Sequence, residues 1–341
     1  MRPSAISAEP RPVSLVIPTL NGGARFIELL EALASQDVPG GFEFLVIDSG
    51  SVDGTPEQAE QAGARVMRIP AAEFNHGRTR NMGIAETSGS VVALLTQDAL
   101  PMGPNYLGNL VRPLQLADEG KGPNVDGTYA RQFPRPDCDP ILAERLRQWS
   151  ASRDEPLLQV LAPGEPDASL KLFEGLPPFE RYLSCAFDNV ASAMRRSSWE
   201  KIPYPEASFG EDVAWARATL LAGGAIAFEP SAQVEHSHRI SMRREFKRLY
   251  CDHRNLNQLF GLRNVPSWAA VRSGWRGQAG VYRKLLASQP IGFFERCYWT
   301  LYAYPYAFQE GMAQFLGARS LWKTDESAFW NWFDARMRRG V

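Results

Sequence analysis

This sequence of 341 residues contains no long apolar run, and we expect it to have no secretory leader. A helix needs roughly 20 mostly apolar residues to cross a bilayer. The nearest candidate, residues 297–308, is short, rich in tyrosine and interrupted by Pro305. The first 12 residues lack the apolar core of a signal peptide, and we expect them to form a flexible tail. We therefore expect a cytoplasmic protein that at most attaches peripherally to the inner face of the cell membrane.

Cysteine is scarce as well. The sequence contains four cysteines, which lie far apart at Cys138, Cys185, Cys251 and Cys297. Because no two of them form a CxxC pair, the sequence argues against a structural zinc site or a redox motif. Isolated cysteines of this kind are typical of reduced thiols in a reducing compartment.

The net charge is only −1, but the charges are unevenly distributed along the chain. Residues 239–341 contain 17 Lys and Arg against 7 Asp and Glu, whereas residues 1–238 contain 20 against 31. This asymmetry indicates two regions with different partners. Since no helix-turn-helix, zinc-finger or RNA-binding motif accompanies the basic region, we expect no nucleic acid among the partners. An anionic substrate or an anionic membrane surface fits that region at least as well.

Apolar strands alternate with helical patterns over the first hundred residues. We predict four strands, each an apolar run that is followed by polar or turn-forming residues, at residues 13–17, 42–47, 65–69 and 91–95. This order predicts an α/β fold with a right-handed, mostly parallel sheet and helices on both faces. Ligands bind beyond the carboxyl ends of such strands. The polar residues Thr19, Asp48 and Asp98 lie at those ends.

The pattern becomes less regular after residue 100. We predict further elements as a helix at 105–117, strands at 125–130 and 189–194, and a helix that begins at Gly210-Glu211-Asp212. Residues 150–180 are rich in proline and are predicted to be loop-like. From Ser241 onward the pattern is helical and aromatic, which predicts a C-terminal helical region.

Three short segments are candidates for chemistry, and each also has a structural interpretation. In Thr96-Gln97-Asp98-Ala99, the carboxylate could hold a divalent ion and through it a diphosphate, or it could form a turn. Glu211-Asp212 is a candidate pair of functional carboxylates, or it caps a helix and compensates the helix dipole. In His236-Ser237-His238, two imidazoles on the same side of an extended chain could bind one metal. All three lie within one α/β region, and this combination favours a catalytic site.

Ordered sequence blocks run from residue 13 to residue 240. The first two are Val16-Ile17-Pro18-Thr19-Leu20-Asn21-Gly22-Gly23 and Val46-Ile47-Asp48-Ser49-Gly50-Ser51-Val52-Asp53-Gly54-Thr55. The next are Phe74-Asn75-His76-Gly77-Arg78-Thr79-Arg80-Asn81 and Leu95-Thr96-Gln97-Asp98-Ala99. The last are Phe187-Asp188-Asn189-Val190, Arg195 to Pro203, Gly210 to Trp215 and His236-Ser237-His238. Together these blocks resemble family 2 glycosyltransferases with the GT-A fold, and the second pair resembles the rhamnosyltransferase branch of that family.

The resemblance implies a division of the chain into a GT-A catalytic domain at 13–240 and a helical, basic and aromatic region at 241–341. Residues 13–100 would form a Rossmann-like nucleotide-binding half, and residues 101–240 would form the acceptor-side half. The implied reaction is transfer of a sugar from a nucleotide sugar to a hydroxyl group with inversion. The implied cofactor is Mg²⁺ or Mn²⁺.

Roles for individual residues follow from the same resemblance. Asp48 would accept a hydrogen bond from the pyrimidine ring of the nucleotide. Asp98 would bind the metal, with His236 and His238 as further ligands. Asp212 would be the general base that removes the proton of the acceptor hydroxyl. The other residues implied to bind the nucleotide sugar are Thr19, Asn21, Ser49, Asp53, Arg80 and Gln97, together with Asp98. Glu211 and Trp215 would lie on the acceptor side.

Two positions depart from the usual family pattern. Thr96 stands where the common DxD motif has its first Asp, and Ser49 replaces the second Asp of Asp-Asp-Gly-Ser. Because Thr-Gln-Asp-Ala resembles the rhamnosyltransferase branch, we expect dTDP-L-rhamnose as donor and a surface glycan or polyprenyl-linked oligosaccharide as acceptor. The alternatives are another dTDP- or UDP-sugar, a nucleotidyltransferase, or a non-catalytic sugar- or membrane-binding relative. A nucleotidyltransferase would need a Gly-rich loop with a basic residue after the first strand, and Asn21-Gly22-Gly23 provides none.

Two clusters in the last hundred residues each allow two interpretations. Arg244, Lys247 and Arg248 would share one face of a helix, which is either solvated or in contact with an anionic ligand. Eight aromatic residues lie between Phe293 and Phe308. They either pack the helical region against the catalytic domain or form an interfacial helix on a membrane.

Overall fold

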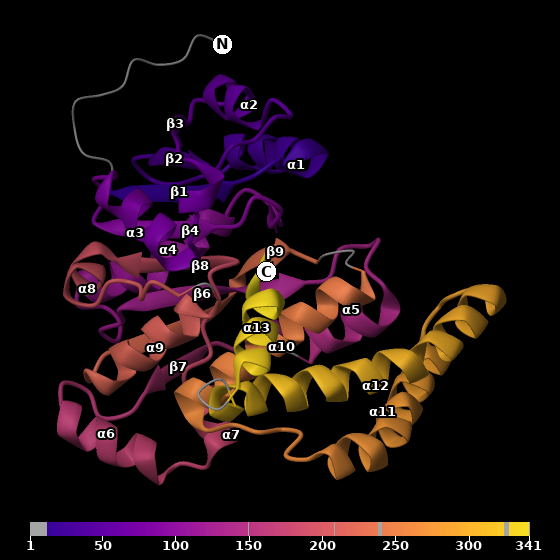
Figure 1. Ribbon diagram of the computed structural model, residues 1–341. Coiled ribbons are helices and arrows are strands. Elements are labelled where there is room, and N and C mark those ends of the chain that lie inside the picture. Colours follow the sequence, from indigo (N-terminus) through magenta and orange to yellow (C-terminus); the bar gives the residue numbers. More distant parts are fainter. Residues whose placement is uncertain (1–11, 149, 208, 238–240, 324–326, 341) are drawn as a thin grey trace.

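The fold is a nine-stranded sheet covered by helices, with a helical region that extends away from it (Figure 1). The computed structural model describes residues 12–148, 150–207, 209–237, 241–323 and 327–340. The predicted tail therefore lies outside the described residues except for Pro12, and so does His238.

Parallel strands form the first half of the sheet, as the sequence predicts. They lie in the order β3-β2-β1-β4 and comprise β1 (Val13–Thr19), β2 (Phe42–Asp48), β3 (Arg65–Arg68) and β4 (Val91–Leu95). Every residue of β4 is buried, because helices cover both faces of a parallel sheet and select continuous apolar runs. The connecting helices are α1 (Gly23–Ala34), α2 (Thr55–Gln61) and α3 (His76–Ala85), with a 3₁₀ turn at Ala71–Glu73.

The second half of the sheet is mixed, so the predicted parallel arrangement applies to the first half. Its strands are β5 (Leu100–Pro101), β6 (Gly127–Phe133), β7 (Leu157–Val160), β8 (Ala191–Arg195) and β9 (Ala225–Glu235). Strand β8 is antiparallel to both β4 and β6, whereas β6 and β9 are parallel. Strands β5 and β7 pair with β9 in antiparallel fashion. The carboxyl ends of β1, β2, β4, β6 and β9 therefore share one edge of the sheet with the amino end of β8.

The prediction that residues 150–180 are loop-like is wrong. This stretch contains β7 and two helices, α6 (Pro166–Gly175) and the first part of α7 (Pro178–Ser184). Both helices begin with proline, which fits the first turn of a helix because its missing N–H has no partner there anyway. A further helix, α5 (Pro140–Arg147), begins in the same way, and the Asp139 side chain caps it. The remaining helices of this half are α4 (Tyr106–Asp118), α8 (Arg196–Lys201) and α9 (Glu211–Leu221), with a 3₁₀ turn at Ser150–Ser152.

Two hydrophobic cores lie on opposite faces of the sheet, and successive residues of β1 alternate between them. One core contains Phe26 of α1 and Leu110 of α4. The other contains Ile84 of α3, Trp215 of α9 and Phe260 of α10 (Met242–Phe260). The first helix of the C-terminal region is therefore part of the core that supports the sheet.

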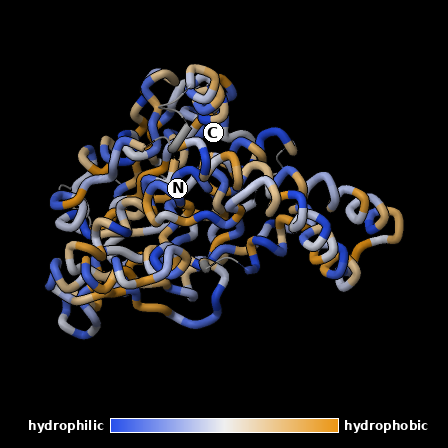
Figure 2. The backbone as a smooth tube through the Cα atoms, turned by 60° about the horizontal axis from the view of Figure 1, so that its bottom comes forward, coloured by the Kyte–Doolittle hydropathy of each residue, from blue (hydrophilic) through white to orange (hydrophobic). Residues whose placement is uncertain are grey.

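The C-terminal region continues with α11 (Trp268–Ser288), α12 (Phe293–Lys323) and α13 (Ala328–Arg338). Helix α10 packs along α12, while α11 and the outer part of α12 form a hairpin that projects from the rest of the molecule (Figures 1 and 2). Arg145 of α5 connects this region to the rest of the fold through ion pairs with Glu245 of α10 at 2.9 Å and Glu310 of α12 at 3.6 Å. None of the helices in the described ranges combines the length and hydrophobicity that crossing a membrane requires.

Candidate active site

Asp48, at the end of β2, joins the loops that follow β1 and β2. Its carboxylate is 2% exposed and accepts hydrogen bonds from the Thr19 hydroxyl at 3.0 Å and the Gly50 and Ser51 N–H groups at 3.0 and 2.9 Å. The Ser51 hydroxyl donates to the same carboxylate. Each carboxylate oxygen therefore already accepts two hydrogen bonds, which uses both of its lone pairs. A pyrimidine N–H can bond to Asp48 only if the Thr19 or the Ser51 hydroxyl turns away.

Side chains also fasten the loop after β1 to the loop after β2. Asn21 adopts a left-handed backbone conformation with φ of 48°, and its side-chain oxygen accepts a hydrogen bond from Val52 N–H at 2.9 Å. Asp53 accepts hydrogen bonds from the Gly23 N–H at 3.0 Å and the Thr55 hydroxyl at 2.6 Å. The bond from Thr55 is the main reason why the pKa of the exposed Asp53 carboxyl is lowered. Asn21 and Asp53 thus shape these loops, and contact with a nucleotide sugar remains a prediction for both.

Ser49 and Gln97 bond to the backbone of the same loop. The N–H and the hydroxyl of Ser49 both donate to the carbonyl of Thr19 at 2.9 Å. The side-chain amide of Gln97 accepts from the Leu20 N–H at 2.8 Å and donates to the Leu20 carbonyl at 3.1 Å. Gln97 therefore connects the segment after β4 to the segment after β1, where the sequence predicts the nucleotide sugar.

Asp98 and His236 face each other at this edge, one following β4 and the other following β9. The His236 Nε2 lies 3.7 Å from the Asp98 Oδ1. A carboxylate and an imidazole at this separation can share a divalent cation. Within the described ranges, no three or more His, Cys, Asp or Glu side chains form a cluster suited to a metal. Further ligands would therefore come from a substrate, from water, or from His238, which lies outside the described residues.

Asp212, in the first turn of α9, lies beside the segment that leads into β8. Its oxygens accept hydrogen bonds from the N–H groups of Val213 at 2.8 Å and Asn189 at 3.3 Å. Burial raises the pKa of Asp212 well above its usual value, and the charges of Glu211 and Asp188 add to the rise. Asp212 as a whole residue is half-buried. A carboxyl group with a raised pKa in such a residue is suited to accept a proton.

Behind Asp212, Glu211 forms a buried ion pair with Arg80 of α3. The Arg80 Nη1 lies 2.9 Å from the Glu211 Oε1, and both side chains are almost completely buried. The side-chain amide of Asn189 donates to Glu211 at 3.2 Å, and the Tyr204 hydroxyl donates to Asn189 at 2.8 Å. Arg80 is therefore the charge partner of Glu211. The position of Arg80 near the nucleotide and that of Glu211 on the acceptor side both remain predictions.

Trp215 lies in the core beneath the start of α9. It is fully buried, its ring centroid is 5.1 Å from that of Phe187, and its N–H donates to the Ile202 carbonyl at 2.8 Å. A Cβ at Gly127 would lie 2.9 Å from the indole, so the ring packs directly on β6. Because its side chain has no exposed surface, Trp215 can act on the predicted acceptor side only through the residues that it supports. It supports the helix that carries Asp212.

The sequence interpretation did not identify Asn189 as a site residue, although Asn189 contacts both carboxylates at the start of α9. A signal was present, because the polar pair Asp188-Asn189 lies one residue before the buried strand β8. This signal points to the site only if β8 is known to pair antiparallel to β4, because that pairing places the start of β8 at the edge of the sheet where the site lies.

Gly210, which precedes α9, has a backbone conformation that favours glycine. Its φ is +71°, and a Cβ there would lie 2.0 Å from the side-chain nitrogen of Asn255 on α10. We expect Gly210→Ala to destabilise the protein by about 1–3 kcal/mol, because left-handed backbone strain and a clash with Asn255 combine. Urea unfolding would measure the loss. Gly175→Ala is the matched control, since nothing lies within 4 Å of its Cβ position, and an equal effect of both changes would contradict the prediction.

One edge of the sheet brings these groups together. The Thr96 N–H donates to the Val190 carbonyl at 3.0 Å, which places the segment of Asp98 beside the segment of Asn189 and hence beside Asp212. On the other side, the His236 N–H donates to the carbonyl at the end of β6 at 2.8 Å. A parallel half-sheet with polar and acidic groups at its carboxyl edge, joined to a mixed half-sheet along the same edge, is the architecture of a glycosyltransferase with the GT-A fold.

Comparison with known proteins gives the family. Residues 14–155 match the family described as Glycosyl transferase family 2. The chain is 31% identical over 244 residues to the O-antigen chain rhamnosyltransferase RfbN of Salmonella typhimurium, and 32% identical over 242 residues to the O-antigen chain rhamnosyltransferase WbaN of Salmonella anatum. Both alignments cover 70% of each chain. The chain belongs to glycosyl transferase family 2, which favours a glycosyltransferase over the nucleotidyltransferase and the non-catalytic alternatives.

A solved structure supports the same fold. The glucosyl-3-phosphoglycerate synthase of Mycobacterium tuberculosis, determined in complex with uridine diphosphate, superimposes with a TM-score of 0.50 and 18% sequence identity. The superposition covers 74% of this chain and 81% of the synthase. At this identity, the likeness concerns the fold alone.

Proposed function

We propose that the protein transfers L-rhamnose from dTDP-L-rhamnose, with inversion, to a hydroxyl of a surface glycan or a polyprenyl-linked oligosaccharide. The observation that carries the proposal is the similarity to two O-antigen rhamnosyltransferases over 70% of the chain. The segment that resembles the rhamnosyltransferase branch, Thr96 to Ala99, lies at the functional edge of the sheet and supports the same donor.

Asp212 is the proposed general base. The acceptor oxygen forms a bond to the anomeric carbon while the bond from that carbon to the diphosphate oxygen breaks. The proton of the acceptor hydroxyl passes to Asp212, and the leaving diphosphate takes up the negative charge. A single displacement needs one base on the face opposite the leaving group and no second carboxylate as nucleophile.

Asp98 and His236 are the proposed protein ligands of Mg²⁺ or Mn²⁺. A carboxylate oxygen and an imidazole nitrogen are suitable donors for such a cation, and their separation of 3.7 Å allows both to reach it. When bound, the cation supplies positive charge that stabilises the diphosphate. Asn21, Asp48 and Gln97 hold the adjoining loops in place, so that the nucleotide can bind over the ends of β1 and β2.

Asp98→Asn is expected to weaken Mn²⁺ binding in the presence of thymidine diphosphate by roughly 10- to 100-fold, the range seen when groups that support a metal site are removed. The change removes a negative charge but keeps the size of the side chain. Titration of free Mn²⁺ by electron paramagnetic resonance measures the affinity without any turnover. Asp167→Asn, at an exposed acidic residue of α6, is the control, and equal Mn²⁺ affinity of both variants would exclude Asp98 as a ligand.

A donor panel tests the proposed sugar. The protein is incubated with dTDP-L-rhamnose, other dTDP-sugars and UDP-sugars, each with Mg²⁺ or Mn²⁺, and release of the nucleoside diphosphate is followed. We expect dTDP-L-rhamnose to give the highest rate. Turnover of another donor, with none for dTDP-L-rhamnose, would contradict the donor assignment but not the glycosyltransferase reaction.

A further inference from the structure

An exposed apolar row runs along the outer part of α12. It consists of residues spaced alternately by four and three positions, which places them on one face of the helix: Phe294, Tyr298, Leu301, Pro305 and Phe308. The exposed fractions of Phe294 and Leu301 are 86% and 73%, and that of Tyr298 is 57%. Monomeric soluble proteins rarely leave a continuous row of large apolar side chains in water, and such a surface marks an interaction site.

A basic row on α11 flanks this apolar row. Four of its residues carry positive charge and are exposed, namely Arg272, Arg276, Arg283 and Lys284, and the helix contains no Asp or Glu. Arg283 donates to the Tyr304 hydroxyl of α12 at 2.9 Å, which holds the two rows side by side.

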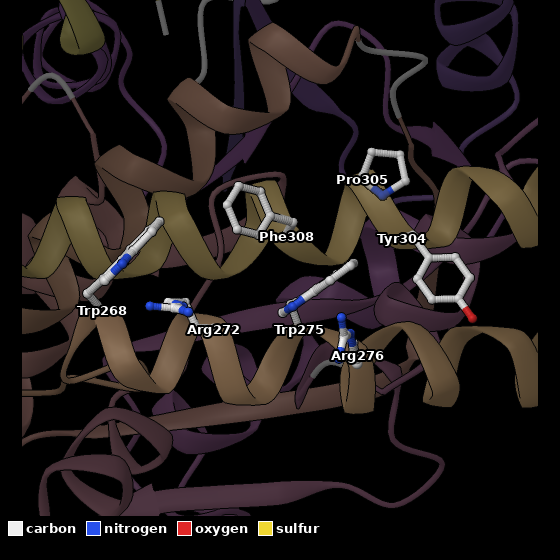
Figure 3. A pocket seen from close by; sticks show the side chains of 7 residues that line it. All are labelled: Trp268, Arg272, Trp275, Arg276, Tyr304, Pro305 and Phe308. Atoms are coloured by element: carbon white, nitrogen blue, oxygen red, sulfur yellow. The ribbon is translucent and has the colours of Figure 1, made fainter.

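The two rows meet in a pocket of about 640 Å³ on the hairpin (Figure 3). Two tryptophans and two arginines of α11 line it, opposite Tyr304, Pro305 and Phe308 of α12. The Trp275 ring packs edge-on against Phe308 at 6.1 Å, and the Arg276 guanidinium lies 5.4 Å from the Trp275 ring. Aromatic rings with a polar end, beside cations on long apolar stems, suit the boundary between lipid headgroups and acyl chains.

We propose that the α11–α12 hairpin docks the protein on an anionic membrane surface. The apolar row would enter the boundary region, and the basic row would contact anionic headgroups. A symmetric contact between two copies of the chain fits less well, because it would bring two rows without acidic residues against each other. A soluble anionic glycan would leave Phe294 and Leu301 without a role. This docking does not depend on which sugar is transferred.

The hairpin is firmly connected to the catalytic part of the molecule. Helix α10 packs along α12 and also contributes Leu256 and Phe260 to the core that holds α9. The ion pairs of Arg145 with Glu245 and Glu310 join α5 to both helices. A membrane bound to the hairpin would therefore set the orientation of the active-site edge relative to the lipid surface.

Co-sedimentation with vesicles tests the proposal. We expect the full-length protein to bind vesicles of phosphatidylcholine mixed with phosphatidylglycerol, to bind pure phosphatidylcholine weakly, and to lose binding as salt is added. Arg272→Gln with Arg276→Gln should weaken binding about 30-fold, since each basic residue near an anionic surface contributes about fivefold. Phe294→Ser with Leu301→Ser should weaken it at least as much, because their apolar surface is removed from the interface.

Leu172→Ser with Phe179→Ser is the matched control, since these residues are 53% and 52% exposed but belong to α6 and α7, which are not part of the hairpin. We expect this variant to bind vesicles like the unchanged protein. Unchanged thymidine diphosphate affinity and melting temperature in all variants would show that folding is intact. Absence of binding to anionic vesicles, or equal binding of all variants, would overturn the proposal. A dimer in solution that dissociates only in the variant with Phe294→Ser and Leu301→Ser would also overturn it. The apolar row of α12 would then be an interface between two copies of the chain.

Discussion

Replacing Asp212 with Asn is expected to lower kcat by about 10²–10⁴-fold, the usual contribution of a general base. Asparagine keeps the shape of the side chain and an oxygen that can accept the Val213 N–H, but it cannot take up the proton of the acceptor. The affinity for thymidine diphosphate should stay the same, because the base acts on the acceptor side. Steady-state kinetics and nucleotide titration would measure the two quantities. Unchanged turnover would contradict the assignment of Asp212, whereas lost nucleotide affinity would indicate a structural role.

The pH dependence of kcat/KM should report the same carboxyl group. Burial, followed by the charges of Glu211 and Asp188, raises the pKa of Asp212. Since the base must be ionised to accept a proton, kcat/KM should fall on the acid side at a higher pH than an ordinary aspartate would produce. This acid limb, measured with dTDP-L-rhamnose and acceptor, should be absent from the residual activity of Asp212→Asn.

Asp212→Asn should lower activity but should not lower the stability of the fold. A carboxyl group whose pKa is raised in the folded state binds more protons when folded, so its contribution to stability decreases as the pH rises through the folded pKa. At neutral pH, Asp212→Asn should therefore melt at the same or a higher temperature than the unchanged protein. The difference should vanish below the pKa of an unfolded aspartate. A variant that is both inactive and clearly less stable would mean that loss of folding, and not loss of the base, explains the kinetics.

The parallel half of the fold was predictable because each strand carries its own signal. Strand β4 is a continuous apolar run and β1 and β2 are mostly apolar, and burial on both faces selects such runs. Helices α6 and α7 were missed because proline interrupts a helix in its interior but fits its first turn, and the position within the helix depends on where the helix begins. The mixed half of the sheet was not predictable in detail, since β6, β8 and β9 pair across long stretches of chain.

In the site, too, residues with a local sequence signal were predictable, whereas contacts between distant segments were not. Asp48 and Asp98 were recognisable because they follow buried strands, and Asp212 because it follows a glycine at the start of a helix. The partners of these groups were not recognisable. Arg80 and Glu211 are far apart in the sequence, and their contact exists only because α3 packs near α9. The full burial of Trp215 was not recognisable either, because its position near Asp212 in the sequence does not show which face of the helix is buried.

Removal of the positive charge from the buried pair by Arg80→Met is expected to destabilise the protein by about 3–5 kcal/mol, because it leaves the Glu211 carboxylate buried without its counter-charge. Arg80→Met combined with Glu211→Gln should recover much of the loss, since glutamine is neutral and keeps an oxygen for the Asn189 amide. Urea unfolding of the single and double variants would measure the coupling. Arg68→Met, at an exposed arginine that pairs with Glu57 and Glu60, is the control and should cost less than about 1 kcal/mol.

Arg80→Met also tests whether the buried pair of Arg80 and Glu211 influences catalysis through the pKa of Asp212. Arg80 opposes the effects of burial, Glu211 and Asp188 on the pKa of Asp212. Without Arg80 the pKa of Asp212 should rise further, so the acid limb of kcat/KM should move to higher pH in Arg80→Met. Neutralising Glu211 in the double variant removes one of the negative charges that raise this pKa, and the limb should move back. If Arg80→Met lost stability but kept the limb at the same pH, the pair would support the fold without tuning the base. If both single and double variants lost nucleotide affinity to the same extent, Arg80 would also contact the donor, as the sequence predicts.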